Sequence, residues 1–295
     1  MKTVPKSDAV TRLSVGASTS PIRYLREAWE RKSLVRVLAS RELKSTYEMN
    51  VVGFAWWLLE PLSLTLVYVV LVSVILKAGQ PAFPLYVLTA LLSFKWLTGS
   101  LTGAMGVVRG NTSLIQDLYF PRALLPVTEV VVGLAHYLIG LLIVPIFMAI
   151  YGIPPSWHLI FLPAIVAAQF LLCLGLAYPL SVWGLNYRNL PGLVGNLFRL
   201  WLYLSPALWS LEVRVHNPKH KLLVKLNPLT GLFESYHGVI GVVPVTDPRT
   251  HEVLNTTKNV IPGWPLAYTA AFGFVALLLG GWYFIRREAQ FGKML

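Results

Sequence analysis

Long apolar runs alternate with short polar stretches along most of the chain, and this alternation sets the expected architecture. Each run is about 20 residues long, the length that crosses a hydrocarbon core as a helix. The ten-residue alternating segments of a membrane β-barrel do not occur. The pattern predicts an all-α polytopic membrane protein with six transmembrane helices, at about Val52–Leu76, Pro84–Val108, Ala123–Tyr151, Leu159–Trp183, Leu190–Leu211 and Pro265–Ile285.

Residues 1–51 are predicted to be a cytoplasmic tail that contains an amphipathic helix. Ser20 suits an N-cap and Pro21 the first helical position, and Ile22, Leu25 and Trp29 then share one face. The helix lies either in the membrane interface or against other protein. We favour the interface, because tryptophan and arginine side chains suit a headgroup layer.

Residues 212–264 have a mixed pattern, in which a wet start is followed by an apolar stretch with polar interruptions at Asn227-Pro228 and Gly231. The stretch is too broken for a simple span, so we expect short re-entrant or interfacial helices on the outer face, before the last span. If it were a seventh span, the C-terminus would lie outside, and Arg286 and Arg287 argue against that.

Composition agrees with a membrane protein: 55% of residues are hydrophobic, 13% are charged and the mean hydropathy is +0.61. The net charge of +12 comes mostly from residues that flank the spans, so we expect no nucleic-acid partner. Basic residues gather on the cytoplasmic side of membrane proteins, so both termini and residues 109–122 are placed in the cytoplasm and 212–264 outside. Residues 52–295 then form a six-span domain. Ten basic residues lie before the first span: Lys2, Lys6, Arg12, Arg23, Arg26, Arg31, Lys32, Arg36, Arg41 and Lys44.

Motifs for bond-making chemistry are missing from the sequence. There is no phosphate-binding loop and no zinc-protease motif, and the six histidines lack metal-like spacing. Cys173 is the single cysteine, which excludes a disulfide within the chain. No signal peptide is expected, because no short apolar segment with a cleavage site precedes the first span. We therefore expect no enzyme activity, cofactor or metal in this chain, and transport against a gradient would need a partner that supplies energy.

Ionisable groups inside the predicted spans are candidates for a substrate path, since charges are costly in a bilayer. Glu60 and Arg199 lie about 12–14 Å from the cytosolic face, at 1.5 Å per residue, and this equal depth permits a pair between them. Lys95 lies near mid-span, where it is expected to line a path. The alternative is snorkelling to the interface, which suits Glu129 well, Arg199 fairly and Lys95 poorly.

Aromatic side chains are plentiful, and most fall near span ends as in an interfacial belt. Trp201 and Tyr203 lie deeper, and ring faces also stack well on sugars. Together with the ionisable groups they give the candidate path, which consists of Trp56, Trp57, Glu60, Lys95, Arg199, Trp201 and Tyr203.

Several stretches, spread over about residues 30 to 290, resemble ABC-2-type polysaccharide export permeases, the membrane subunits that move O-antigen, teichoic acid and capsule. Gly53, Trp56 and Pro61 match the start of that family's first span. "NYRN" at 186–189 is similar to its turn after span four, where Asn189 stands in place of the usual acid. Other similar stretches are "RELKSTY", "GNTSLIQDLYFPRALLP", "LSPALW" and "LNPLTGLFE".

The resemblance implies a homodimer with two copies of a cytosolic ABC ATPase, which binds ATP and Mg²⁺, in the bacterial plasma membrane. It also implies a cytosolic coupling helix at 109–122. Its greasy face, formed by Leu114, Ile115 and Leu118, would dock in the ATPase; an idle interfacial helix is the alternative. The expected coupling residues are Asn111, Leu114, Ile115, Asp117, Leu118, Tyr119, Phe120, Arg122 and Arg188.

The predicted function is the permease subunit of an ATP-driven exporter that moves a lipid-linked polysaccharide, such as teichoic acid or O-antigen, outward. An ABC exporter of drugs or small lipids is one alternative. An ion-driven secondary transporter is another, but it would be expected to show internal repeats, and none is evident. A membrane-embedded transferase would want paired carboxylates, whereas Glu212, Asp247 and Glu252 are scattered.

Overall fold

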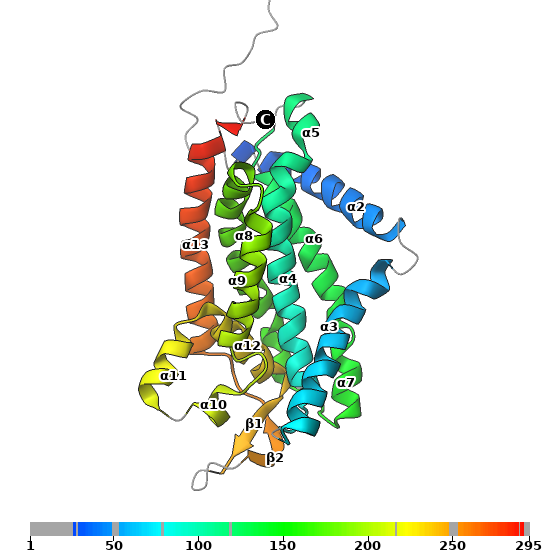
Figure 1. Ribbon diagram of the computed structural model, residues 1–295, viewed down its shortest axis with the longest axis vertical. Helices are drawn as coiled ribbons and strands as arrows, with labels where there is room; N and C mark the ends of the chain where they lie inside the picture. The colour runs from blue at the N-terminus through cyan, green and yellow to red at the C-terminus, as the bar shows by residue number, and fades with distance from the viewer. Residues whose placement is uncertain are drawn as a thin grey trace, which may run out of the picture.

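The structure, a computed structural model, describes residues 26–27, 29–48, 53–77, 80–117, 120–215, 217–247, 253–288 and 290–291. Its long helices lie side by side in an upright bundle, with a small β-hairpin at one end (Figure 1). The elements are α2 Lys32–Glu48, α3 Gly53–Val69, the π-helical η1 Val70–Ile75, α4 Phe83–Gly110, α5 Thr112–Asp117, α6 Leu124–Leu141, α7 Val144–Ile150, the 3₁₀ turn η2 Trp157–Phe161, α8 Leu162–Asn186, α9 Leu190–Leu204, α10 Leu211–Arg214, α11 Pro218–Lys225, α12 Pro228–Ile240, β1 Val243–Thr246, β2 Val253–Lys258 and α13 Trp264–Glu288.

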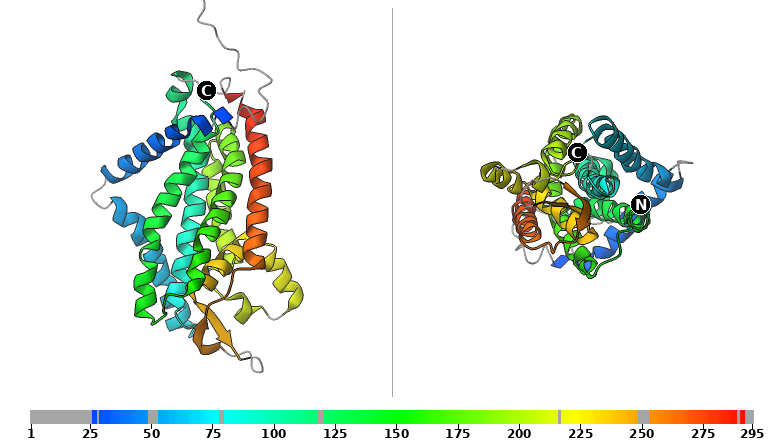
Figure 2. Two further views of the ribbon diagram at one scale, coloured as in Figure 1. Left: turned by 180° about the vertical axis from the view of Figure 1, so that it is seen from behind. Right: turned by 90° about the horizontal axis from the view of Figure 1, so that it is seen from below.

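A helix occupies each of the six predicted ranges, and successive helices run in opposite directions along the bundle (Figures 1 and 2). Helix α5, the start of α2 and the end of α13 lie at one end, which we call the inner end. The hairpin and α10 to α12 lie at the other, the outer end. Four segments are long and apolar enough to cross a membrane: Leu58–Ile75, Leu124–Ile150, Trp157–Asn186 and Trp264–Glu288. The chain is therefore a helical, multi-pass membrane protein.

Two of the predicted spans are interrupted, in both cases at a proline. The third is split into α6 and α7, and Pro145 occupies the first turn of α7, where its missing N–H is tolerated. The fifth was predicted to reach Leu211, but α9 ends at Leu204. Ser205 precedes Pro206 and is extended, with φ −103° and ψ 149°, as the residue before a proline tends to be.

Helix α2 leaves the inner end obliquely and packs against α6 through Val35 and Ala39, which are buried. Trp29 is 70% exposed, and the Lys32 ammonium lies 4.5 Å from the centre of its ring. The predicted helix start at Ser20 and Pro21, and the apolar positions Ile22 and Leu25, lie outside the described residues. The apolar face that the structure does describe is thus turned toward the bundle, while Trp29 faces away from it.

The outer segment, residues 212–264, contains short helices as expected and in addition two short strands. Besides α10, α11 and α12 it contains an antiparallel hairpin, in which Val243 pairs with Lys258 and Pro244 with Thr257. Helix α12 is buried along almost its whole length. It starts at Asn227, whose side chain accepts the Leu229 N–H, and ends at Gly241 in the left-handed conformation.

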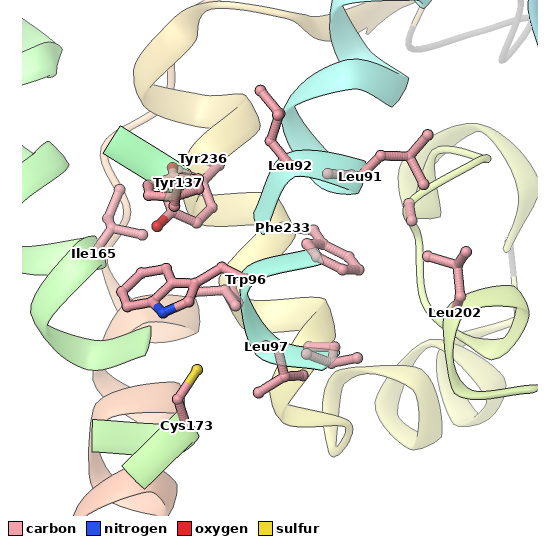
Figure 3. Packing of buried hydrophobic residues seen from close by; sticks show 14 of the residues in the cluster. Leu91, Leu92, Trp96, Leu97, Tyr137, Ile165, Cys173, Leu202, Phe233 and Tyr236 are labelled. Atoms are coloured by element: carbon pink, nitrogen blue, oxygen red, sulfur yellow. The ribbon is translucent and has the colours of Figure 1, made fainter. Parts of the chain in front are cut away.

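The outer half of the core is built around stacked aromatic rings from α4, α6 and α12 (Figure 3). Trp96 stacks on Tyr137, with ring centres 5.1 Å apart, and Tyr137 tilts against Tyr236. One fully buried polar side chain crosses this core: Gln169 Nε2 donates to the Ser93 carbonyl, and its Oε1 accepts from the Ser93 and Tyr236 hydroxyls. Gln169 therefore ties α8 to both α4 and α12.

Small residues let α8 and α13 approach closely. A Cβ on Gly280 would lie 2.3 Å from the Gly175 carbonyl oxygen, and one on Gly175 would lie 2.6 Å from the Leu277 nitrogen. Such close backbone contact is typical of helix pairs in membranes, where small residues replace the hydrophobic effect as the basis of association. Helix α13 is therefore held rigidly along α8.

Candidate coupling segment and translocation path

The predicted coupling segment forms a short helix, α5, that stands on the inner end of α4 (Figure 1). The turn between the two helices is stabilised by side chains: Asn111 Nδ2 donates to the Val107 carbonyl, and Thr112 Oγ1 donates to the Arg109 carbonyl. Asn and Thr bond readily to nearby backbone in this way. A six-residue helix is marginal by itself, so α5 depends on what it packs against.

The inner side of α5 packs into a cluster of buried residues that we call the inner cluster. Ile115 is only 8% exposed there, and Leu114 is half-buried against the same residues. The predicted greasy face therefore lies, in these two residues, against the chain's own bundle. The cluster consists of Val107, Val108, Ile115, Phe120, Ala123, Leu125, Val182, Leu185, Phe284 and Phe291.

The outward side of α5 is polar. Ser113 and Gln116 are exposed, and Asn111 is half-buried. The side chain of Asp117 and the whole of Leu118 and Tyr119, three of the predicted coupling residues, lie outside the described part of the chain. A protein that approached this end would thus meet hydroxyl and amide groups on α5.

The segment is fastened at both ends by arginines. Arg109 Nη2 donates to the Leu185 carbonyl at 2.6 Å, near the C-terminus of α8, where the helix dipole favours a cation. Arg122, a predicted coupling residue, donates its backbone N–H to Glu288 Oε1 at 2.8 Å and its Nη1 to the Glu288 carbonyl at 3.0 Å. Arg188, in the turn between α8 and α9, is exposed.

Two of the predicted path residues form an ion pair with each other. Glu60 on α3 bonds to Lys95 on α4, with Oε2 and Nζ 2.5 Å apart, instead of the Glu60–Arg199 pair that equal depth permitted. Equal depth was a poor guide, because α4 packs directly on α3, whereas Arg199 is exposed on α9 and bonds to Asn196 of its own helix. Lys95 is thus neutralised within the bundle, as a charge at that depth requires.

The predicted aromatic residues divide into one anchored and one exposed side chain. Trp201 is half-buried, and its Nε1 donates to Asn227 Oδ1, which joins α9 to the start of α12. Tyr203 is exposed, and the Tyr68 hydroxyl donates to its hydroxyl at 3.1 Å across α3 and α9. Trp56 and Trp57 belong to α3, but their side chains lie outside the described part.

Two features that sequence reasoning did not single out matter for these sites. Glu288 and Phe291 hold the coupling segment from the end of α13, and Gln169 connects three helices at the level of the aromatic core. The lone Gln169 in an apolar run was a usable signal, since a polar residue inside a span normally faces a partner. Within the described ranges, no three His, Cys, Asp or Glu side chains gather closely enough to hold a metal ion.

His237 on α12 shows how strongly the outer segment is built into the bundle. Its ring stacks on that of Tyr86, with centres 3.6 Å apart, and Nε2 lies 2.9 Å from the Tyr86 carbonyl oxygen. A carbonyl only accepts, so Nε2 carries the proton. Burial lowers the pKa of His237 to about 3, although the carbonyl bond opposes this shift. The imidazole is therefore neutral at physiological pH.

The relatives found by comparison with known proteins are named as O-antigen export permeases. The chain is 31% identical over 218 residues to the O-antigen export system permease protein RfbA of Myxococcus xanthus, covering 74% of this chain and 84% of that protein. Two RfbA permeases of Klebsiella pneumoniae are 24% identical over 204 residues, which is 69% of this chain and 78% of each relative. No family model matches the chain.

These relatives, the apolar helices and the ordered motifs lead to one assignment. The alternatives of a secondary transporter and of an exporter of drugs or small lipids are not favoured, because the matched proteins are named as O-antigen exporters. The chain belongs to the family of ABC-2-type polysaccharide export permeases, the membrane subunits of ABC exporters of cell-surface polysaccharide.

Proposed function

We propose that this chain moves a lipid-linked polysaccharide outward across a bacterial plasma membrane, as a homodimer that carries two copies of a cytosolic ABC ATPase. Each subunit would span the membrane six times, with both termini in the cytoplasm. Helices α4 and α9 would supply the two spans beyond the four most apolar ones. The glycan would be O-antigen, teichoic acid or a chemically similar polymer on a lipid carrier. ATP and Mg²⁺ would be bound by the ATPase, and this chain would perform no bond chemistry.

The observation that carries the proposal is the build of α5. It is a short helix at the inner end of α4. The side that faces away from the bundle is polar, and the side that faces the bundle is held by Ile115 and the inner cluster. ATP-driven closure of a partner can move a membrane bundle only through a contact that is rigid on both sides. Ser113 and Gln116 would meet the ATPase, while Ile115 and Leu114 would pass the displacement into α4. This changes the docking face expected from the sequence but keeps the coupling role.

The path would run along α3 and α9, which flank α4 (Figures 1 and 2). Both helices leave much apolar surface uncovered in the single subunit, including Leu66 and Val67 on α3 and Leu197 and Leu200 on α9. A second copy of the chain would cover part of this surface. The Glu60–Lys95 pair and the exposed Tyr203 ring would then face the glycan, whose hydroxyls and C–H faces they suit.

Helix α2 and the outer segment would close the two ends of the path. Helix α2 lies obliquely at the inner end and carries its basic residues on exposed positions, among them Arg36 and Arg41. A basic amphipathic helix in that place is suited to the headgroups of anionic membrane lipid. At the other end, Asn227 links Trp201 of α9 to α12, so a movement of α9 would reach the outer segment directly.

The test is export by the purified permease with its ATPase in proteoliposomes, measured as ATP-dependent appearance of a lipid-linked glycan on the far side of the membrane. The double variant Ser113→Arg, Gln116→Glu alters only exposed α5 side chains and is expected to lower glycan-stimulated ATP hydrolysis and export together. The matched control, Thr256→Arg with Lys258→Glu, alters exposed residues of β2 at the outer end and should leave ATP hydrolysis unchanged. Undiminished export without any ATPase would overturn the proposal.

A further inference from the structure

Glu288, the last residue of α13, bonds to Arg122 at the C-terminal end of the coupling segment. Glu288 accepts the Arg122 backbone N–H through its carboxylate, and its own carbonyl accepts from the Arg122 guanidinium. Both bonds involve a charged group on one side, and such bonds are shorter and stronger than neutral ones. Two residues separated by most of the sequence are therefore fixed in both backbone and side chain.

Packing of apolar side chains beside the Arg122–Glu288 contact holds the same two segments together. Phe291 is 1% exposed, and its ring meets that of Phe284 edge to face, with centres 5.3 Å apart. Both rings belong to the inner cluster. The cluster also contains Ile115 of α5 and Phe120, which follows α5 in the coupling segment. The end of α13 thus packs into the same buried cluster as α5.

The opposite end of α13 contacts the outer segment just as closely. Thr269 Oγ1 donates to the Pro228 carbonyl at the start of α12, and a Cβ on Gly231 would lie 2.5 Å from the Pro265 carbonyl oxygen. Between these ends α13 is packed against α8 through glycines. One rigid helix therefore touches the coupling segment at the inner end and α12 at the outer end.

We propose that Glu288 and Phe291 are positioning residues, which clamp the coupling segment to α13 so that a push on α5 moves α13 and, through it, α12. The inference rests on the coupling role assigned to α5 above. Neither residue touches the substrate or the ATPase in this account. Without these contacts, the six-residue helix α5 would shift relative to α13, and its displacement would not be passed on to α13.

The clamp can be measured without the ATPase or the glycan. A nitroxide is attached to full-length permease carrying Cys173→Ala and Gln116→Cys, since Cys173 is the single native cysteine and Gln116 is exposed. The electron paramagnetic resonance spectrum should show a restricted label, and Glu288→Ala or Phe291→Ala should make it mobile. Glu288→Gln keeps an acceptor oxygen and should have a smaller effect. The matched controls are Gln290→Ala, next to the clamp, and Phe274→Ala, an exposed aromatic of the same helix.

Export per ATP hydrolysed, measured in proteoliposomes with the ATPase, separates positioning from mere folding. Glu288→Ala should lower this ratio about tenfold, the factor that corresponds to one hydrogen bond to a charged group, at unchanged permease abundance and ATPase binding. A label that stays restricted in both alanine variants would overturn the clamp, whatever α5 touches. A mobile label with a normal ratio would support the clamp and would contradict the coupling role of α5 in the proposed function.

Discussion

Gln169→Leu tests whether the buried polar link between α4, α8 and α12 stabilises the bundle. Leucine has a similar volume and suits an apolar span, so hydropathy alone predicts a neutral or stabilising change. The structure predicts the opposite, because Gln169 is fully buried and makes three hydrogen bonds, to the Ser93 hydroxyl, the Ser93 carbonyl and the Tyr236 hydroxyl.

The magnitude follows from those bonds. Hydrogen bonds between helices in a membrane contribute about 0.6 kcal/mol each, so three contribute about 2 kcal/mol. An independent route gives a similar figure: the variant leaves two buried hydroxyls without this partner, and an unsatisfied buried group costs about 1–3 kcal/mol. We expect Gln169→Leu to lower the free energy of unfolding by about 2 kcal/mol or somewhat more.

The assay is reversible unfolding of the purified permease in mixed micelles, followed by tryptophan fluorescence. The matched control is the triple variant Gln169→Leu, Ser93→Ala, Tyr236→Phe, which removes both hydroxyl partners together with the amide and should recover most of the loss, because apolar groups of similar shape then replace the side-chain network. A triple variant as unstable as the sum of its single changes, or a single Gln169→Leu without effect, would refute the reasoning.

Three further predictions use the same structure. Lys95→Met with and without Glu60→Gln should give a coupling energy of about 1 kcal/mol in a double-mutant cycle of stability, because Glu60 is half exposed; additive effects would show that the pair does not form. Gly280→Val should destabilise by about 2 kcal/mol in the same unfolding assay, since its Cβ would collide with the Gly175 carbonyl, whereas the neighbouring Gly281→Val has room at 3.9 Å and should be tolerated. Because the pKa of His237 is about 3 when folded and 6.5 in a free chain, stability should be intact above pH 6.5 and fall by about 1.4 kcal/mol per unit below it; a His237→Gln variant should lose that slope, and an unchanged slope would contradict it.

Much of the helical framework was predictable because a bilayer leaves the backbone little choice. A spanning segment must satisfy its own N–H and C=O groups, so an apolar run of the right length becomes a helix. The ranges around α4, α8 and α13 agree with the sequence for this reason. The early end of α9 was also readable in principle, because Pro206 restricts the residue before it. The hairpin carried a signal too, since Val243, Val245 and Thr246 are β-branched residues typical of strands.

The contacts at the candidate sites were less predictable, because they depend on which helices are neighbours. Counting residues along the spans gave Glu60 and Arg199 the same depth, but only packing decides that Glu60 meets Lys95. The apolar positions Leu114 and Ile115 identified a helix face correctly as greasy, while the sequence did not say whether that face meets a partner or the bundle itself. The Arg122–Glu288 contact joins distant parts of the chain, and neither residue is unusual in its local sequence.

The most direct test of the account is photo-crosslinking of the assembled exporter with a benzophenone amino acid at Gln116, on the exposed side of α5, and at Lys258, on the exposed hairpin of the outer end. The account predicts a covalent adduct between this chain and the ATPase from position 116, enhanced or weakened by ATP, and no ATPase adduct from position 258. Efficient ATPase adducts from Lys258, or none from Gln116 in an exporter that still hydrolyses ATP and moves glycan, would contradict it.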